Sequence, residues 1–364
     1  MSIPKEYFEV VRETGKFAKR EFGEHALDWD LNPDPSHITS LWIKSLGLDL
    51  PVLTIPEEFS GVGYGPVCQA LVVDAMASRC PGVASVFVHH FAGLFPVQFA
   101  NKDQQTELWG AATGKAGRGI AGVVFDHDGA LSIKPSGNGF ILNGTSSLTA
   151  NAQYADWASV FTSDQKGNPI CFVVDNRSPG VSLGPNPELP GLKINPFHSL
   201  VFKDVAVPAH AILCNPEKSA QLMEQTRDLL HVLTAATALG AARTAYEKAL
   251  AYARERYQFG KMIIEHQEIR RMIGAMRMKL DAATANLYEY FEENPGPLSR
   301  ADRKASLVKA FCTDAAFDII VDAIQVHGGY GYMHEQGLEK LMRDAKVLQV
   351  LGGSNPQLLV EAME

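Results

Sequence analysis

The sequence predicts an α+β protein with an N-terminal α-helical domain, a central antiparallel β domain and a C-terminal four-helix bundle. Its 364 residues exceed what one hydrophobic core normally organises, so more than one domain is expected. Apolar residues recur at helical spacing in residues 1–117 and again in residues 216–364, whereas residues 118–215 contain short β-rich runs. We therefore place the three predicted domains at these ranges.

The N-terminal range contains helical patterns interrupted by one breaker-rich segment. Residues 51–65 are rich in Pro and Gly, which end helices. On either side of this segment, the spacing of apolar residues predicts helices at residues 5–22, 38–46 and 67–79. The first 117 residues are therefore expected to form a helical unit.

The central range changes character. Its apolar runs are short and rich in β-branched and aromatic residues, and Gly, Pro, Asn and Asp separate them. The runs lie at residues 119–124, 140–142, 158–161 and 170–174. This alternation of strand and turn signals predicts a compact antiparallel β domain.

The C-terminal range has long helical patterns. Residues 294–297 (NPGP) form the one strong breaker between residues 261 and 328. Before it, apolar residues follow one another in alternating steps of four and three, which is the seam of a helix packed nearly antiparallel to its neighbours. The seam consists of Ile269, Ile273, Met276, Leu280, Ala283 and Leu287. We interpret this stripe as structural.

Composition excludes several classes of protein. With 46% hydrophobic and 20% charged residues, the chain can bury enough apolar surface to fold. No apolar run reaches the roughly 18 residues that a membrane span needs. The first residues are amphipathic and mixed in charge, without the apolar core of a signal peptide, so a cytoplasmic location is expected. The net charge of −8 and the lack of a basic stripe argue against a nucleic-acid partner.

Metal-site patterns are not found in the sequence. The five cysteines are scattered and form no C-x-x-C pair, so they are expected to be reduced thiols. The histidines show no i, i+4 pairing with a carboxylate. We therefore expect no metal ligands.

A set of short motifs carries a resemblance to a known family. The C-terminal half contains residues 256–260 (RYQFG), 266–267 (HQ), 325–332 (QVHGGYGY) and 343–346 (RDAK). The N-terminal half contains residues 46–48 (LGL) and 55–63 (IPEEFSGVG), and residues 143–144 (NG) lie in the β-rich range. In this order and spacing, across essentially the whole chain, these motifs resemble the acyl-CoA dehydrogenase family.

The resemblance implies a chemistry and an assembly. Members of the family hold FAD at a subunit interface in homotetramers or dimers of dimers, and they act on a CoA thioester. A carboxylate removes the α-proton while the β-hydrogen leaves as a hydride to the flavin. The resemblance also implies an electron-transfer flavoprotein as the electron acceptor.

One half of the implied FAD site is present. Arg256 matches the family arginine that meets the pyrophosphate, for which a guanidinium is well suited. The other matching positions line the adenosine and the pyrophosphate, and Gly there lets the backbone approach the phosphates. They are Phe259, Gln267, Gln325, Gly328 and Gly329. In the family, a subunit lends this half of the site to its neighbour.

The half that would hold the flavin ring in the same subunit is altered. Residues 124–129 (VFDHDG) replace the family's Thr-Glu-Pro and its Gly/Ser loop. Leu148 stands where the family has a tryptophan, and Ala150 stands where it has a hydroxyl residue. Leu cannot stack on the flavin as Trp does, and Ala cannot hydrogen-bond to it.

The implied catalytic base is missing. Its usual position falls on Gly352, and the alternative family position falls on Leu230, neither of which can accept a proton. His231 replaces a family arginine, while Asp228 is retained. Asp228 is a candidate for contact with CoA, and the equal alternative is that it simply faces solvent. His89 is a candidate for contact with the acyl group.

Three functions remain open. The first is the base-deficient subunit of an α2β2 hetero-oligomer, in which a paralogous acyl-CoA dehydrogenase subunit supplies the base and the ring pocket. The second is a self-sufficient flavoenzyme with a displaced base or a different reaction, for which His89, His90 and residues 126–128 (DHD) are the candidates. For His89 and His90, the favoured interpretation is that they are partly buried residues of a helix. For residues 126–128, it is a turn in which Asp caps its own backbone. The third is a protein without redox function that assembles with others or binds CoA.

Overall fold

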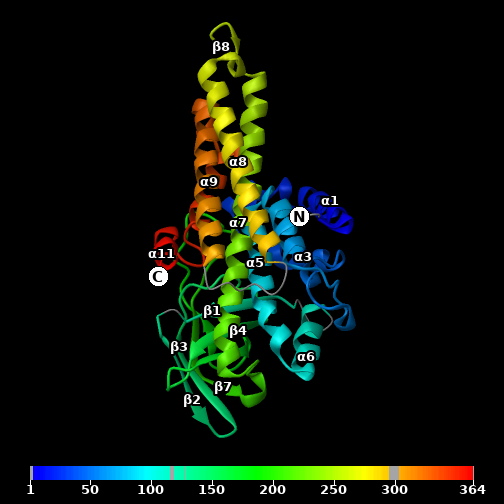
Figure 1. Cartoon of the computed structure of the whole chain (residues 1–364), viewed down its shortest axis with the longest axis vertical. Coiled ribbons are helices and arrows are strands. Elements are labelled where there is room, and N and C mark those ends of the chain that lie inside the picture. Colours follow the sequence, from blue (N-terminus) through cyan, green and yellow to red (C-terminus); the bar gives the residue numbers. More distant parts are fainter. Residues whose placement is uncertain (1–2, 115–118, 127, 295–302, 364) are drawn as a thin grey trace.

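The computed structural model describes residues 3–114, 119–126, 128–294 and 303–363. Figure 1 shows an elongated molecule. A long bundle of α7, α8 and α9 carries strand β8 at its tip, and a β-rich part occupies the opposite end. The N-terminal helices lie alongside, near the middle of the molecule.

The N-terminal part is helical, as predicted. Polar residues set several helix starts: Asp34 accepts a hydrogen bond from the backbone N–H of Ser36, and Asn101 forms a capping box with Gln104. The α-helices of this part are α1 (Lys5–Ala18), α2 (Ala26–Leu31), α3 (Pro35–Leu46), α4 (Pro66–Ala77), α5 (Pro81–Leu94) and α6 (Lys102–Ala112). The helices predicted at 5–22, 38–46 and 67–79 correspond to α1, α3 and α4, and α1 continues as a π-helical turn, Lys19–Gly23.

Helix α5 is buried along its whole length, because α4, α7 and β1 pack around it. Among the described residues, Pro81–Phe99 is the one segment long and apolar enough to cross a membrane, with a hydropathy of 1.2. Inside the protein, 83% of its most apolar stretch is buried. Such burial is what a core helix shows, and α5 brings two histidines, His89 and His90, into the interior.

The central part consists of two sheets that pack face to face. One has the order β1-β4-β5 and the other β2-β3-β7-β6. Residues from both sheets, such as Val124, Leu142 and Phe172, share one apolar cluster. The strands are β1 (Ala121–Phe125), β2 (Leu131–Ser136), β3 (Gly139–Thr145), β4 (Trp157–Ser163), β5 (Pro169–Asp175), β6 (Val181–Leu183) and β7 (Leu200–Pro208).

The prediction of a purely antiparallel domain is wrong at one pair of strands. Strand β1 pairs parallel to β4, with Ala121 opposite Trp157, and the other pairs in these two sheets are antiparallel. A parallel pair needs a long connection. The chain between these strands supplies it by forming β2 and β3 of the other sheet before it returns.

The C-terminal part is built on α7, a helix of 40 residues that Asn215 caps by accepting a hydrogen bond from the backbone N–H of Lys218. Its elements are α7 (Pro216–Glu255), β8 (Tyr257–Gln258), β9 (Lys261–Met262), α8 (Gln267–Glu293), α9 (Lys304–His327), α10 (Leu338–Leu348) and α11 (Asn355–Glu361). The seam predicted for α8 is confirmed: Ile273 to Leu287 are buried at its five inner positions, and Ile269 packs at the edge of the core. Of the breaker at 294–297, residues 295–297 lie outside the described residues.

Small residues let α7 approach its neighbours closely. At Gly240, a Cβ would collide with the backbone carbonyl of Asp74 on α4. One turn further along, Arg243 donates to the Asp74 carboxylate at 2.6 Å. Helix α7 therefore holds the N-terminal helices and the bundle together, and it runs from the β-rich part to the far tip of the molecule (Figure 1).

Candidate functional site

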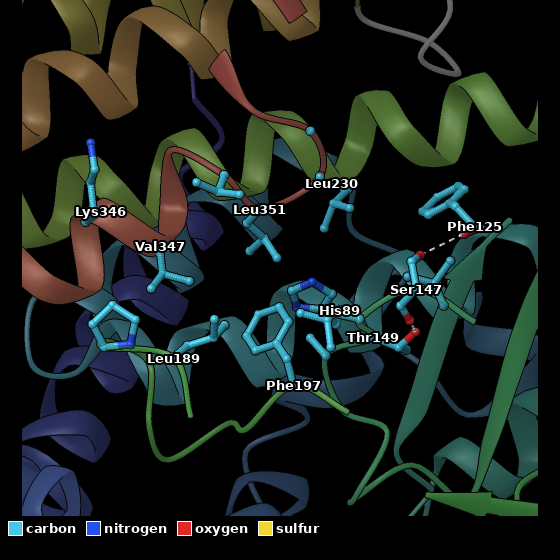
Figure 2. A pocket seen from close by; sticks show the side chains of 17 residues that line it. His89, Phe125, Ser147, Thr149, Leu189, Phe197, Leu230, Lys346, Val347 and Leu351 are labelled. Atoms are coloured by element: carbon cyan, nitrogen blue, oxygen red, sulfur yellow. Dashed lines mark hydrogen bonds between the residues drawn. The ribbon is translucent and has the colours of Figure 1, made fainter. Parts of the chain in front are cut away.

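A cavity of about 460 Å³ lies where the β domain, α5 and the C-terminal bundle meet. Figure 2 shows side chains from all three pointing into it: His89 from α5, Leu230 from α7, Val347 from α10, and Phe197 from the loop before β7. Most of its lining is apolar. A cavity of this size and character suits the organic part of a small-molecule ligand.

Both positions that the resemblance implies for the catalytic base border this cavity. Leu230 points into it from α7 (Figure 2), and Gly352 lies in the loop between α10 and α11. Neither has a carboxylate, and the described residues that line the cavity include no Asp or Glu. Gly352 has φ +73°, a left-handed conformation that favours glycine.

Two cationic or polar groups hold the loop around Gly352. The Nε2 of His231 lies 2.8 Å from the Gly352 carbonyl, which only accepts, so this nitrogen donates. The Lys309 ammonium is buried and donates to the carbonyls of Gln349 and Gly353 and to Oδ1 of Asn355, at 2.7–2.9 Å. Burial lowers the pKa of Lys309 to about 7.

Sequence reasoning missed Lys309. The signal was present, because Lys309 stands among apolar residues in the second turn of α9. A lysine in such a place is buried only when its donors find acceptors. Its acceptors come from a loop about 40 residues further along the chain, which the local pattern does not reveal.

The adjacent histidines of α5 have different environments. Both ring nitrogens of His90 are hydrogen-bonded inside the protein. Its Nε2 lies 3.0 Å from the Pro51 carbonyl, and its Nδ1 accepts from the backbone N–H of Ala121. His89 is 3% exposed and lines the cavity, and its Nδ1 lies 2.8 Å from the Ser85 carbonyl. Burial lowers the pKa of His89 to about 4 and that of His90 to about 3. Both rings are therefore neutral near pH 7.

We expect acidification from pH 7 to pH 5 to destabilise the fold. In the unfolded chain both histidines have a pKa of about 6.5, so below that pH the unfolded state binds protons that the folded state excludes. The contribution of these neutral rings to the free energy of unfolding is present above pH 6.5, and it is lost as the pH falls toward 4. At pH 5 each ring contributes a loss of about 2 kcal/mol in the free energy of unfolding. Urea unfolding at both pH values measures the effect.

His89→Gln is the matched variant for this experiment, because it retains a polar side chain without a titrating ring. Its loss of stability between pH 7 and pH 5 should be about 2 kcal/mol smaller than in the wild-type protein. An equal acid-induced loss in both proteins would contradict the assignment of His89 as a buried neutral ring.

The loop opposite α5 carries the altered ring-side residues. Leu148 is 47% exposed at the cavity edge and Ala150 is buried. The hydroxyl of Thr149 donates to the Ser147 carbonyl at 3.1 Å, and that of Ser147 donates to the Phe125 carbonyl at 3.4 Å (Figure 2). The hydrogens of both hydroxyls are therefore used within the protein.

The acidic turn next to β1 has a structural role. The Asp126 carboxylate accepts hydrogen bonds from the backbone N–H groups of Ala130 and Leu131 and from the hydroxyl of Thr162. It caps its own turn, in agreement with the reading favoured from the sequence. His127 of this cluster lies outside the described residues. Asp228 is nearly buried on α7 and does not line the cavity.

A second hollow, of about 450 Å³, lies near the tip of the bundle. It brings together Arg256, Gly328 and Gly329. The Arg256 guanidinium lies 5.5 Å from the centroid of the Tyr330 ring, and within the described chain it has no ion-pair partner. A Cβ on either glycine would meet nothing within 4 Å, so the backbone there is open to a ligand.

Three further residues expected at the FAD do not line this hollow. Phe259 is 92% exposed at the turn between β8 and β9, with φ +52°. Gln267 is the first residue of α8, Gln325 lies in the last turn of α9, and both are exposed. The segments that carry these residues lie at the same end of the molecule as the end of α7, the end that bears β8 in Figure 1.

The two hollows lie far apart in one chain. Leu230 and Arg256 are separated by 26 residues of α7, which corresponds to about 39 Å along the helix. The two hollows are therefore separate sites of this chain.

Comparison with known proteins gives matches over most of the sequence. The acyl-CoA dehydrogenase N-terminal domain matches residues 4–115, the middle domain residues 128–205 and the C-terminal domain residues 222–359. Cyclohexane-1-carbonyl-CoA dehydrogenase of Syntrophus aciditrophicus is 30% identical over 353 residues, which are 91% of this chain and 90% of that protein. The probable acyl-CoA dehydrogenase YngJ of Bacillus subtilis is 30% identical over 98% of this chain and 97% of its own length.

Solved structures show the same fold. Butyryl-CoA dehydrogenase from Megasphaera elsdenii superimposes with a TM-score of 0.90 at 24% identity, over 100% of this chain and 98% of that chain. An acyl-CoA dehydrogenase complexed with FAD from Bacillus anthracis superimposes with a TM-score of 0.88 at 22% identity, over 99% of this chain and 68% of that chain.

Proposed function

Because the chain belongs to the acyl-CoA dehydrogenase family, we propose that it is the base-deficient subunit of a cytoplasmic hetero-oligomer that desaturates a CoA thioester between its α and β carbons. The cofactor is FAD, as the family and the FAD complex among the similar structures indicate. A paralogous subunit, in an α2β2 assembly, supplies the base and the flavin-ring pocket. An electron-transfer flavoprotein takes the electrons.

One observation carries this proposal: no carboxylate lines the cavity among its described residues, and both positions of the family base are filled by groups that cannot take a proton. Removal of an α-proton needs an acceptor within hydrogen-bond reach of it. Leu230 offers none, and Gly352 has no side chain. The second hollow, in contrast, keeps an arginine and open glycine backbone, which supports its use as a site that this chain lends to the cofactor of another chain.

The residues present fit the pyrophosphate end of FAD. Bound FAD supplies the hydride acceptor of the reaction. Arg256 would meet phosphate oxygens with its guanidinium, which the Tyr330 ring orients. Gly328 and Gly329 leave room for phosphate to approach the main chain. Phe259, Gln267 and Gln325 would contact the same cofactor from the exposed surface around the hollow.

The test is flavin stoichiometry after co-expression with a paralogous acyl-CoA dehydrogenase subunit that has the catalytic glutamate. We expect the mixed complex to contain one FAD per two chains, and we expect this protein purified alone to retain no flavin. Absorbance spectra with quantified protein measure both values.

One oxidised FAD per chain in the protein expressed alone would contradict the proposal. If that homomer also turned over a CoA thioester and His89→Leu abolished the turnover, a self-sufficient enzyme with a displaced base would replace it. Colourless protein in both preparations, unchanged by added FAD, would instead indicate assembly or CoA binding without redox function.

A further inference from the structure

The cavity at α5 is lined by His89, whose ring nitrogen Nε2 has no hydrogen-bond partner within the described part of the chain. Around it the wall is apolar, with Leu189, Phe197, Leu230, Val347 and Leu351 among the lining residues. Figure 2 shows the His89 ring lying among them, with Phe197 on one side and Leu230 and Leu351 on the other. The ring is held edge-on to Phe197, with centroids 6.1 Å apart.

The hydrogen bond of His89 to its own helix fixes the tautomer. The Ser85 carbonyl can only accept, so Nδ1, 2.8 Å away, carries the proton and donates it. Since the buried ring is neutral near pH 7, Nε2 then has a lone pair and no hydrogen. Within the described part of the chain, this nitrogen has no hydrogen-bond partner. It can therefore accept a hydrogen bond from a ligand but cannot give one.

The other polar groups of the same cavity have different surroundings. The Ser147 and Thr149 hydroxyls donate to backbone carbonyls, and their oxygens remain acceptors on the β-domain side of the cavity. Lys346 points away from the interior in Figure 2 and donates to Oε1 of Gln349 at 2.9 Å. The neighbouring His90 has both ring nitrogens paired inside the protein. Among these groups, His89 is the acceptor that lies among the apolar side chains of the wall in Figure 2.

We propose that His89 makes this cavity selective for an apolar acyl group that carries a hydroxyl, whose O–H donates to Nε2. The inference rests on the proposed acyl-CoA function and names the class of acyl group that this chain's own cavity binds, as distinct from the thioester that reacts at the partner's flavin ring. A plain alkyl chain would cover Nε2 without pairing it, and a carbonyl or ether oxygen would set two lone pairs against each other. Both cost binding energy, because a buried acceptor without a donor loses its hydrogen bond to water.

The test is calorimetric titration of the full-length protein with matched CoA thioesters. The probes are hexanoyl-CoA and hydroxyhexanoyl-CoA isomers that place the hydroxyl at successive carbons beyond the α-carbon. We expect one isomer to bind about 10- to 100-fold more tightly than hexanoyl-CoA. His89→Leu should abolish this preference while hexanoyl-CoA still binds, and His89→Gln, which keeps an acceptor, should retain part of it.

Ser147→Ala is the matched control, because its hydroxyl lines the same cavity but donates to the Phe125 carbonyl. It should keep the preference of the wild-type protein. Thioester binding without a preference for any hydroxylated isomer, or a preference that persists in His89→Leu, would overturn the inference and leave the proposed function standing.

A second pair of probes separates the inference from the acyl-CoA function. Cyclohexanol has a donor and cyclohexanone does not, and neither needs CoA recognition. If no thioester binds but cyclohexanol binds more tightly than cyclohexanone in the wild-type protein and not in His89→Leu, the proposed substrate class is wrong and the role of His89 stands. Equal binding of the two rings would overturn that role.

Discussion

Replacing Arg256 with alanine in the mixed complex is expected to weaken FAD binding by about 10- to 100-fold, because a hydrogen bond to a charged group contributes about 1.5–3 kcal/mol. Arg256 ends α7 at the edge of the glycine hollow, and a guanidinium there can pair with two phosphate oxygens. The measurement is flavin retained per complex after gel filtration, together with the dissociation constant from flavin fluorescence.

Arg254→Ala is the matched control for this experiment. Arg254 lies two residues earlier on α7, is exposed and does not line the hollow. Its removal changes the net charge equally and should leave FAD affinity unchanged. Arg256→Lys should fall between the two, since lysine keeps the charge but loses the planar fork. An Arg256→Ala complex that retains as much FAD as the Arg254→Ala complex would contradict the role of Arg256 at the cofactor.

Lys340→Met is expected to destabilise the fold by about 3–5 kcal/mol, because it leaves the Asp344 carboxylate buried without its cation. The two groups lie 2.6 Å apart on α10, and both are almost completely buried. Burial alone would lower the pKa of Lys340, but the adjacent Asp344 carboxylate raises it above its usual value. Asp344 also accepts from the backbone N–H of Leu192, so the pair holds the loop before β7 against α10.

The double variant Lys340→Met, Asp344→Asn separates the ionic effect from the shape of the site. Asparagine keeps an acceptor for the Leu192 N–H and removes the charge, so most of the lost stability should return. Urea unfolding of the wild-type, single-variant and double-variant proteins measures these differences. A loss below about 1 kcal/mol in the single variant would show that Asp344 has another compensating partner.

Much of the architecture was readable from the sequence. The helical spacing of apolar residues predicted α1, α3 and α4, and the seam of α8 proved to be buried as expected. Periodicity works for these elements because each buries one face against a neighbour. The parallel pairing of β1 with β4 was missed, since nothing in either strand records which partner it meets after the chain has passed through another sheet.

The site was predicted less completely than the fold. The resemblance places the implied base at Gly352 or Leu230 and the implied ring-side contacts at Leu148 and Ala150, and these assignments stay predictions. Residue identity did not show that Lys309 and His231 hold the loop of Gly352 from two different helices. Such contacts join residues that are distant in the chain and carry no local pattern.

By itself, the sequence determined which chemical groups this protein has: an arginine and two glycines suited to phosphate, and Leu230 and Gly352 at the positions that the resemblance implies for the base. The tertiary structure decided how those groups are distributed. Helix α7 places Arg256 about 39 Å from Leu230 along its axis. The structure also decided that His89 faces a cavity, whereas both ring nitrogens of His90 are hydrogen-bonded to backbone groups. The partners of the two rings come from different segments of the fold.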